Sequence, residues 1–222
     1  MFQYSKGSLN PLNIQENCVI IDHFIQTQGK KHISIQEGVT HCEYFYIGEK
    51  SLLDLEIVVT ASNVHLQIYG LIFGQGEHSH CHTTLLTQAN SIQANMHLIS
   101  IVQESSQIEH RGTITIPSNF HQIETHLLEE HVMLWDTLHI HAQPVLQIAS
   151  HDVRASHWAK IERLDEEKLL YMMSRGLTRV QAQKLILNGY INHITQQLSN
   201  AATQQEQQEI QEITESLKTQ LA

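Results

Sequence analysis

Short apolar runs rich in β-branched residues dominate the chain from about Cys18 to Ile148, and no apolar period of 3.6 is sustained there over a dozen residues. Several runs alternate apolar residues with polar residues or histidine, which gives a strand one buried and one hydrated face. The clearest runs are Val19–Ile25, Leu53–Val59, Val64–Phe73, Met96–Val102, Gly112–Ile116 and Val145–Ile148. The pattern predicts an all-β segment.

The connections between these runs contain few turn residues. The whole chain has three prolines and ten glycines, whereas a meander of tight hairpins shows more Asn-Gly and Asp-Gly signals. Short strands with polar corners at spacings of about 8–12 residues also suit a β-solenoid, in which each coil buries the apolar face of its neighbour. We therefore expect a mainly β protein whose solenoid domain spans residues 1–163.

The composition changes at Leu164, where a helical domain covering residues 164–222 is expected to begin. Asp165 and the two glutamates after it suit a first helical turn, and Arg175-Gly176 suits its end. Thr178 is expected to cap a second helix, with Gln181 as its capping-box partner. Its predicted core residues are Val180, Leu185, Ile186 and Leu187, with Gly189 as a candidate interruption, and an amphipathic tail follows with Ile210, Ile213, Leu217 and Leu221.

The charge balance disfavours two classes of partner. The chain has 13 Lys and Arg against 23 Asp and Glu, and Arg111 and Arg154 are the only two between positions 51 and 159. Nucleic-acid binding needs a basic surface that releases counterions, so no nucleic-acid partner is expected. No apolar run approaches the roughly 18 residues of a membrane span, and the first residues do not resemble a secretory signal. We expect a cytoplasmic protein without a membrane partner.

Cysteine and histidine are the residues that suggest chemistry. The three cysteines, Cys18, Cys42 and Cys81, are widely separated, and they are too few for the four thiolates of an ordinary iron–sulfur cluster. Thirteen of the 17 histidines lie between positions 65 and 157. On a strand, His78, His80 and His82 would share one face and could converge on a metal ion. A small histidine-rich β metalloprotein or metalloenzyme is therefore one hypothesis, and a polar strand or loop is the other reading of this pattern.

A different signal runs from Pro144 to Leu177, and it resembles the C-terminal signature of the SufB/SufD family of iron–sulfur cluster assembly proteins. The family pattern is "P-x-L-x-I", then "D-D-V-x-C-S-H-G-A-T", then "L-D-E-E-x-L-F-Y-x-x-S-R-G-I". The matching positions are Pro144, Leu146, Ile148, Asp152, Val153, Ser156, His157, Ala159, Leu164 to Glu167, Leu169, Tyr171, Ser174, Arg175 and Gly176. The likeness extends over residues 109–190, is looser over 66–108, and leaves the first 60 residues unassigned.

The resemblance implies a right-handed parallel β-helix followed by a small helical domain. Family members are non-enzymatic scaffold subunits of a complex in which an iron–sulfur cluster is built. It further implies that a SufD-like subunit pairs with a SufB-like subunit through the β-helix, while the helical domains dock a SufC-like ABC-type ATPase. Ser156-His157-Trp158 stands where the SufB type has Glu-His-Glu, which favours the SufD type.

Two departures from the pattern affect the expected site. Ala155 replaces the family cysteine, and Trp158 replaces the following glycine, so one soft ligand is lost. Contact with a cluster then rests on His157, and we expect a cluster shared transiently with a partner subunit and none tightly bound to the isolated chain. The alternative for His157 is a coil-edge histidine bonded to backbone. The chain is also shorter than usual members and lacks their N-terminal helical region, which suggests a shortened SufD-like protein or a purely structural member of the complex.

The helical signature supplies the expected partner surface. We expect the ATPase to dock on Leu170, Tyr171, Met173, Arg175 and Gly176; the alternative is that these residues only hold the helical domain against the β-helix. A solenoid also leaves a sheet edge open, and open strands pair with other chains. We therefore expect a homodimer when the protein is isolated and a SufB-like partner in the cell.

Overall fold

The computed structural model describes residues 1–75, 78–103, 107–134, 139–199, 207–208, 210–212, 214–215 and 218. The chain forms two compact units, Met1–Glu162 and Arg163–Ala222. The boundary expected from composition, between residues 163 and 164, lies one residue farther along.

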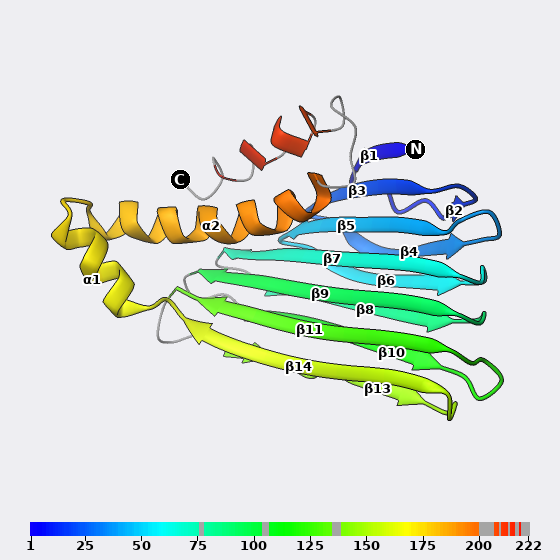
Figure 1. The fold of residues 1–222 in the computed structure, drawn as a ribbon. Coiled ribbons are helices and arrows are strands. Elements are labelled where there is room, and N and C mark those ends of the chain that lie inside the picture. The colour runs from blue at the N-terminus through cyan, green and yellow to red at the C-terminus, as the bar shows by residue number, and fades with distance from the viewer. Residues whose placement is uncertain are drawn as a thin grey trace. The chain divides into compact units, whose positions relative to one another are not determined.

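The first unit is a parallel β-helix made of two sheets (Figure 1). One sheet has the order β1 (Phe2–Lys6), β3 (Cys18–Ile25), β5 (His41–Glu49), β7 (Val64–Gln75), β9 (Ile92–Gln103), β11 (Ile123–Met133) and β14 (Val153–Arg163). The other has the order β12 (His139–His141), β10 (Gln107–Ile116), β8 (His78–Thr87), β6 (Leu52–Val59), β4 (Gln28–Ile35) and β2 (Leu12–Ile14), and β13 (Val145–Ile148) also pairs with β10. The expected β-helix followed by helices is confirmed.

All six predicted runs lie in strands, and the strands of one sheet lengthen from β1 to β7. β1 has five residues, β3 has eight, and β7 and β9 have twelve each. After each of the first eleven strands the chain crosses to the other sheet, so neighbouring strands of one sheet are one coil apart. Strict alternation then sends every second side chain into the space between the sheets. In β8 this buries Ser79, Cys81, Thr83 and Leu85.

The corners use left-handed backbone at residues other than glycine. Asn63, Ser91 and Gln122 directly precede β7, β9 and β11, with φ of 60°, 58° and 58°. Gln26 and Lys50 follow β3 and β5, each with φ of 49°. Such a conformation costs a side chain that is not glycine a small steric penalty, which hydrogen bonds between successive corners offset, as from the Ser91 amide to the His121 carbonyl at 3.1 Å. The corners therefore repeat in structure without a repeating glycine.

The second unit contains α1 (Glu166–Ser174) and α2 (Arg179–Ser199), and its caps are those expected. Asp165 accepts hydrogen bonds from the amides of Glu167 and Lys168. Thr178 and Gln181 form a reciprocal capping box with distances of 2.8 and 3.2 Å. None of the helices that the structure describes is long and apolar enough to span a membrane.

Two expectations for this unit were wrong. The helix α2 continues through Gly189 to Ser199. Its buried residues include Ala182, Leu187 and Ile191, while Val180 and Leu185 are 69% and 55% exposed. Leu185 precedes Leu187 by two residues, or about 200° around a helix, and therefore faces away from it. In the predicted tail, Ile210 is buried; Ile213, Leu217 and Leu221 lie outside the described residues.

The interior of the β-helix contains buried polar groups as well as apolar ones. The Tyr46 hydroxyl lies 2.6 Å from Thr83 Oγ1 and 2.8 Å from His110 Nε2, and His110 Nδ1 lies 3.0 Å from Ser100 Oγ. Asp22, nearer the N-terminus, accepts from Lys31 Nζ at 2.6 Å and from the Tyr44 hydroxyl at 2.8 Å. These networks satisfy most groups that burial has removed from water, as packed interiors require.

His131 is a buried exception in this interior. Neither of its ring nitrogens makes a hydrogen bond to a described residue, and Nε2 lies 4.0 Å from the Glu129 carboxylate. Burial lowers the pKa of His131 to about 4. Burial, with the nearby His131, also holds the pKa of His110 well below its usual range. Both imidazoles are therefore neutral in the folded protein at pH 7.

We predict that Gly70→Ala destabilises the β-helix. A Cβ at Gly70 would overlap the Tyr46 ring and hydroxyl, and Tyr46 cannot easily move because Thr83 and His110 hold its hydroxyl. The free energy of unfolding, measured in urea, should fall by about 2 kcal/mol. Gly189→Ala is the control, because open space surrounds that helical position and the change should stabilise by about 0.5–1 kcal/mol. Equal stability of Gly70→Ala and the wild type would contradict the prediction.

The neutral state of His131 predicts a specific loss of stability in acid. Its pKa rises from about 4 in the folded protein to about 6.5 when unfolded, so the unfolded state binds the extra proton. The contribution of neutral His131 to the free energy of unfolding is complete above about pH 6.5. It falls by about 3 kcal/mol as the pH is lowered to 4.

Urea unfolding at several pH values tests this for wild type, His131→Leu and the exposed control His121→Leu. The free energy of unfolding of His131→Leu should fall less steeply between pH 6.5 and 4 than that of the other two proteins. Parallel curves for all three would show that His131 is not the titrating group.

Candidate functional site

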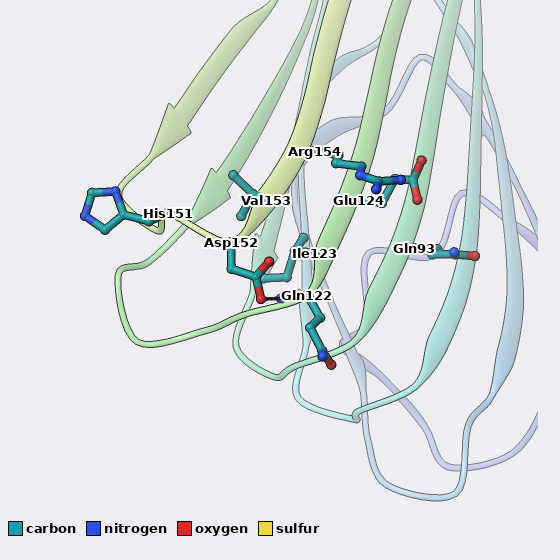
Figure 2. A pocket seen from close by; sticks show the side chains of 8 residues that line it. All are labelled: Gln93, Gln122, Ile123, Glu124, His151, Asp152, Val153 and Arg154. Atoms are coloured by element: carbon teal, nitrogen blue, oxygen red, sulfur yellow. Dashed lines mark hydrogen bonds between the residues drawn. The ribbon is translucent and has the colours of Figure 1, made fainter.

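The signature segment enters β14 through a corner that ties this strand to β11. Asp152 Oδ2 accepts a hydrogen bond from the Gln122 amide at 3.1 Å (Figure 2), and the backbone carbonyl of Asp152 accepts one from the Ile123 amide at 3.4 Å. The carboxylate of Asp152 thus satisfies a backbone donor just before the neighbouring strand. This part of the signature has a structural role, because it fixes where β14 starts.

A pocket of about 380 Å³ opens at this corner. Its lining residues are Gln93, Gln122, Ile123, Glu124, His151, Asp152, Val153 and Arg154. Figure 2 shows the side chains of Arg154 and Glu124 lying toward one another, while His151 points away from the others. The lining carries both signs of charge, so its chemistry does not select one class of ligand.

His157 lies on β14 and is exposed. Side chains alternate along a strand, so His157 shares a face with Ala155 and Ile161, opposite to Ser156 and Trp158. Ile161 is 50% exposed, and the imidazole of His157 makes no hydrogen bond to any residue that the structure describes. β14 is the last of the described strands in its sheet, so its outer edge has no described strand beside it, and the exposed side chains of His157 and Ile161 leave this face open.

The opposite face of β14 is fixed by contacts to β11. Ser156 Oγ forms a short hydrogen bond with His126 Nδ1. The Trp158 ring stacks on the His126 ring with centroids 6.3 Å apart and planes inclined by 21°. Trp158, which departs from the family glycine, therefore has a packing partner, although it remains 58% exposed. The sequence analysis did not single out His126. The only signal for it was that it occupies one of the polar positions in the alternating pattern of β11.

Charge pairs extend this face beyond Trp158. Glu130 lies 2.6 Å from His97 Nε2 and 3.4 Å from Lys160 Nζ, and Lys160 also lies 2.8 Å from Glu162. The hydrogen bond from His97, together with the Lys160 charge, lowers the pKa of Glu130. Glu130 is therefore ionised at neutral pH and links three strands.

The structure places His78, His80 and His82 on one face of β8, as expected, with Cys81 buried on the other. His80 and His82 have different partners. His80 lies 3.3 Å from Glu109 and 3.9 Å from Asp54, and His82 Nε2 lies 2.8 Å from Thr113 Oγ1. Among the described residues, no group of three His, Cys, Asp or Glu side chains is arranged to hold a metal ion. The geometry thus gives the metalloprotein hypothesis no support.

The expected partner residues of α1 are exposed. Leu170 and Tyr171 are 61% and 60% exposed and Met173 is 37% exposed, whereas Leu169 is the buried residue of this helix. Arg175 Nη2 donates to the Tyr171 hydroxyl at 3.0 Å, and its guanidinium lies 5.2 Å from the ring centroid. Gly176 follows with φ of 94°, as a C′ glycine does. Large exposed apolar side chains and a preformed Tyr–Arg pair thus lie on α1, with Tyr171 and Met173 about 200° apart around the helix.

Comparison with known proteins relates this geometry to one family. The family model "SUF system FeS cluster assembly, SufBD core domain" matches residues 14–190. The iron–sulfur cluster assembly protein SufD of Escherichia coli is 23% identical over 107 residues, which are 48% of this chain and 25% of that protein. A SufBD family iron–sulfur cluster assembly protein of Synechocystis is 29% identical over 104 residues, 47% of this chain and 23% of that protein.

A longer alignment reaches a SufBD family protein of Mycobacterium leprae, which is 22% identical over 154 residues, 68% of this chain and 18% of that protein. The chain therefore spans about a quarter or less of the length of these curated relatives. The family match covers most of the β-helix, all of β14 and α1, and the first part of α2. It includes the segment from Pro144 to Leu177, whose exposed histidine and exposed helix surface are described above. The chain belongs to the SufBD family of iron–sulfur cluster assembly proteins.

Proposed function

We propose that this chain is a non-enzymatic, SufD-like scaffold subunit of an iron–sulfur cluster assembly complex. In this proposal the β-helix pairs with a SufB-like subunit, or with a second copy when the protein is isolated. The helical unit docks a SufC-like ABC-type ATPase, and the complex acts in the cytoplasm. The cluster is cargo that this chain shares transiently with its partner and does not hold tightly alone.

The observation that carries the proposal is the open face of β14. His157 and Ile161 belong to the face that neighbouring strands bury, yet both are exposed. An apolar side chain and an imidazole left open at a strand edge favour pairing with another chain. A neutral imidazole is also a known ligand of iron–sulfur clusters. With Ala155 in place of a cysteine, His157 is the donor that this face offers, and the remaining ligands would come from the partner.

The exposed surface of α1 supports the docking step. Interfaces depend mainly on a few aromatic and arginine anchors surrounded by apolar contacts. Tyr171 and Arg175 form such a pair, and Leu170 and Met173 are exposed beside them in sequence. These side chains are exposed on α1 and are therefore available to a partner.

We predict that pairing and cluster retention can be separated at His157. The chain is mixed anaerobically with a SufB-like subunit of the same organism, and light scattering and cluster absorbance are followed during reconstitution with iron and sulfide. The wild type should form a heteromeric complex that retains a cluster. His157→Ala should keep the mass of the complex but lose at least half of the cluster absorbance, because one ligand is missing.

His151→Ala is the matched control, since it removes another exposed histidine, just before the same strand. It should change neither readout. Full cluster retention in His157→Ala would limit the chain to a purely structural role, and no gain of mass with the partner would reject the pairing itself.

We also predict that Tyr171→Ala and Arg175→Ala weaken ATPase binding. Each should cost about 2 kcal/mol, or roughly 30-fold in Kd, with the melting temperature nearly unchanged. Calorimetric titration with the SufC-like subunit measures the first effect, and thermal unfolding measures the second. Lys30→Ala, which removes an exposed cation from the β-helix, should leave both unchanged, and Leu169→Ala should lower the melting temperature because Leu169 is buried. Intact ATPase binding by both surface variants would reject this docking surface.

A further inference from the structure

Two buried cysteines lie side by side at one end of the β-helix. Cys18 is the first residue of β3 and pairs in register with Cys42 of β5. Their sulfur atoms are 3.5 Å apart, and the residues are 5% and 0% exposed. The sulfur atoms are thus in contact without being bonded.

The surrounding structure keeps this pair together and isolates it. The Asn17 side chain just before Cys18 accepts from the amides of Thr40 at 2.7 Å and His41 at 2.9 Å, which fixes the two strand ends side by side. The next position in the same row is Leu66 of β7. The third cysteine lies elsewhere, with Cys81 Sγ 3.9 Å from Thr83 Oγ1. Cys18 and Cys42 are therefore each other's sulfur partner.

The backbone geometry suits a covalent bond between them. Neighbouring strands lie about 4.7–4.9 Å apart, which falls inside the range of about 4.4–6.8 Å between the Cα atoms of a disulfide. The sulfur atoms must approach to about 2.05 Å and the Cβ atoms to about 3.5–4.5 Å, which rotation about the side-chain bonds and a small inward movement of the two strand ends supply. The strands do not need to separate or shift register.

The two thiols also differ in reactivity. The hydrogen bond between the two thiols, together with the nearby amino terminus, lowers the pKa of Cys18. The same hydrogen bond and burial raise the pKa of Cys42. A thiolate is the reactive form of cysteine, so Cys18 is the residue that an oxidant meets first. Its small exposed fraction and its place one coil from the N-terminal coil of β1 and β2, near the end where solenoids open most readily, give access.

We propose that Cys18 and Cys42 form a reversible disulfide that clamps β3 to β5, with a peroxide as the oxidant. The Cys18 thiolate attacks one peroxide oxygen, which gives a sulfenic acid and, for hydrogen peroxide, one water after protonation. The Cys42 sulfur then attacks Cys18 Sγ and displaces the hydroxyl group, which leaves as a second water with the Cys42 proton. Two thiols are oxidised and one peroxide is reduced; a dithiol reductant reverses the change.

The clamp would act on the two coils next to the N-terminal coil of β1 and β2. Each coil contacts only its neighbours, so unfolding begins at a terminal coil. A covalent link between β3 and β5 closes a loop of 24 residues and restricts the unfolded chain. The melting temperature of the oxidised protein should therefore exceed that of the reduced protein by about 5–10 °C, and a reductant should restore the lower value.

The experiment uses the full-length protein, reduced and then treated with one equivalent of hydrogen peroxide. Remaining thiols are alkylated in denaturant, and the peptides are identified by mass spectrometry. The expected result is a Cys18–Cys42 linked peptide with Cys81 alkylated. Cys81→Ser should behave like the wild type, and Cys42→Ser should abolish the linked peptide and the thermal shift.

Several outcomes would overturn the proposal. They are a linkage that includes Cys81, a disulfide between two chains, alkylation of all three cysteines after oxidation, and a linked protein whose melting temperature does not rise. Because wild-type protein is compared in two redox states, the thermal result does not depend on whether a variant folds. The cluster and ATPase experiments are independent of this one.

Discussion

The in-register parallel ladder is the constraint on which the rest of the structure depends. Each residue of a strand pairs with the residue at the same position one coil away, as Tyr46 pairs with Gly70. Every inward side chain therefore stacks on its equivalents, and no solvent separates them. Where the space is tightest, a bulky group needs a small neighbour in the next coil, and a buried polar group needs a hydrogen-bond partner from another strand. Tyr46 shows both requirements, since Gly70 accommodates its ring and Thr83 and His110 bond its hydroxyl.

The sequence predicted the type of fold better than its arrangement. The alternation of apolar and polar residues identified six strands, and the sparse turn signals indicated a solenoid. The repeat itself was hidden for two physical reasons. Asn63, Ser91 and Gln122 adopt the corner conformation that glycine often marks. The coils also differ in length, because Val64 pairs with Ile92 while Ile92 pairs with Ile123, so no fixed period exists.

The candidate site was predictable only where its residues are neighbours in sequence. The capping residues of α1 and α2 and the exposed positions of the signature could be read from local patterns. The stacking of Trp158 on His126 and the link from His97 through Glu130 to Lys160 join different coils, and their positions depend on coil length. Val180 and Leu185 of α2 were misassigned because an apolar residue in a short helical unit need not face its core. The same surplus of exposed apolar residues is what makes this unit suited to partners.

The lengthening of the strands has a consequence for how the molecule avoids misassembly. β1 has five residues, β3 eight and β7 twelve, so successive coils in this part of the β-helix are not interchangeable. If two chains exchanged coils, or if one strand slipped onto the wrong neighbour, a long strand would lie against a short one and leave backbone donors and acceptors without partners. Such errors cost free energy for every unpaired group that is buried. The taper therefore discriminates against domain-swapped and slipped forms, a safeguard that a solenoid of identical repeats would not possess.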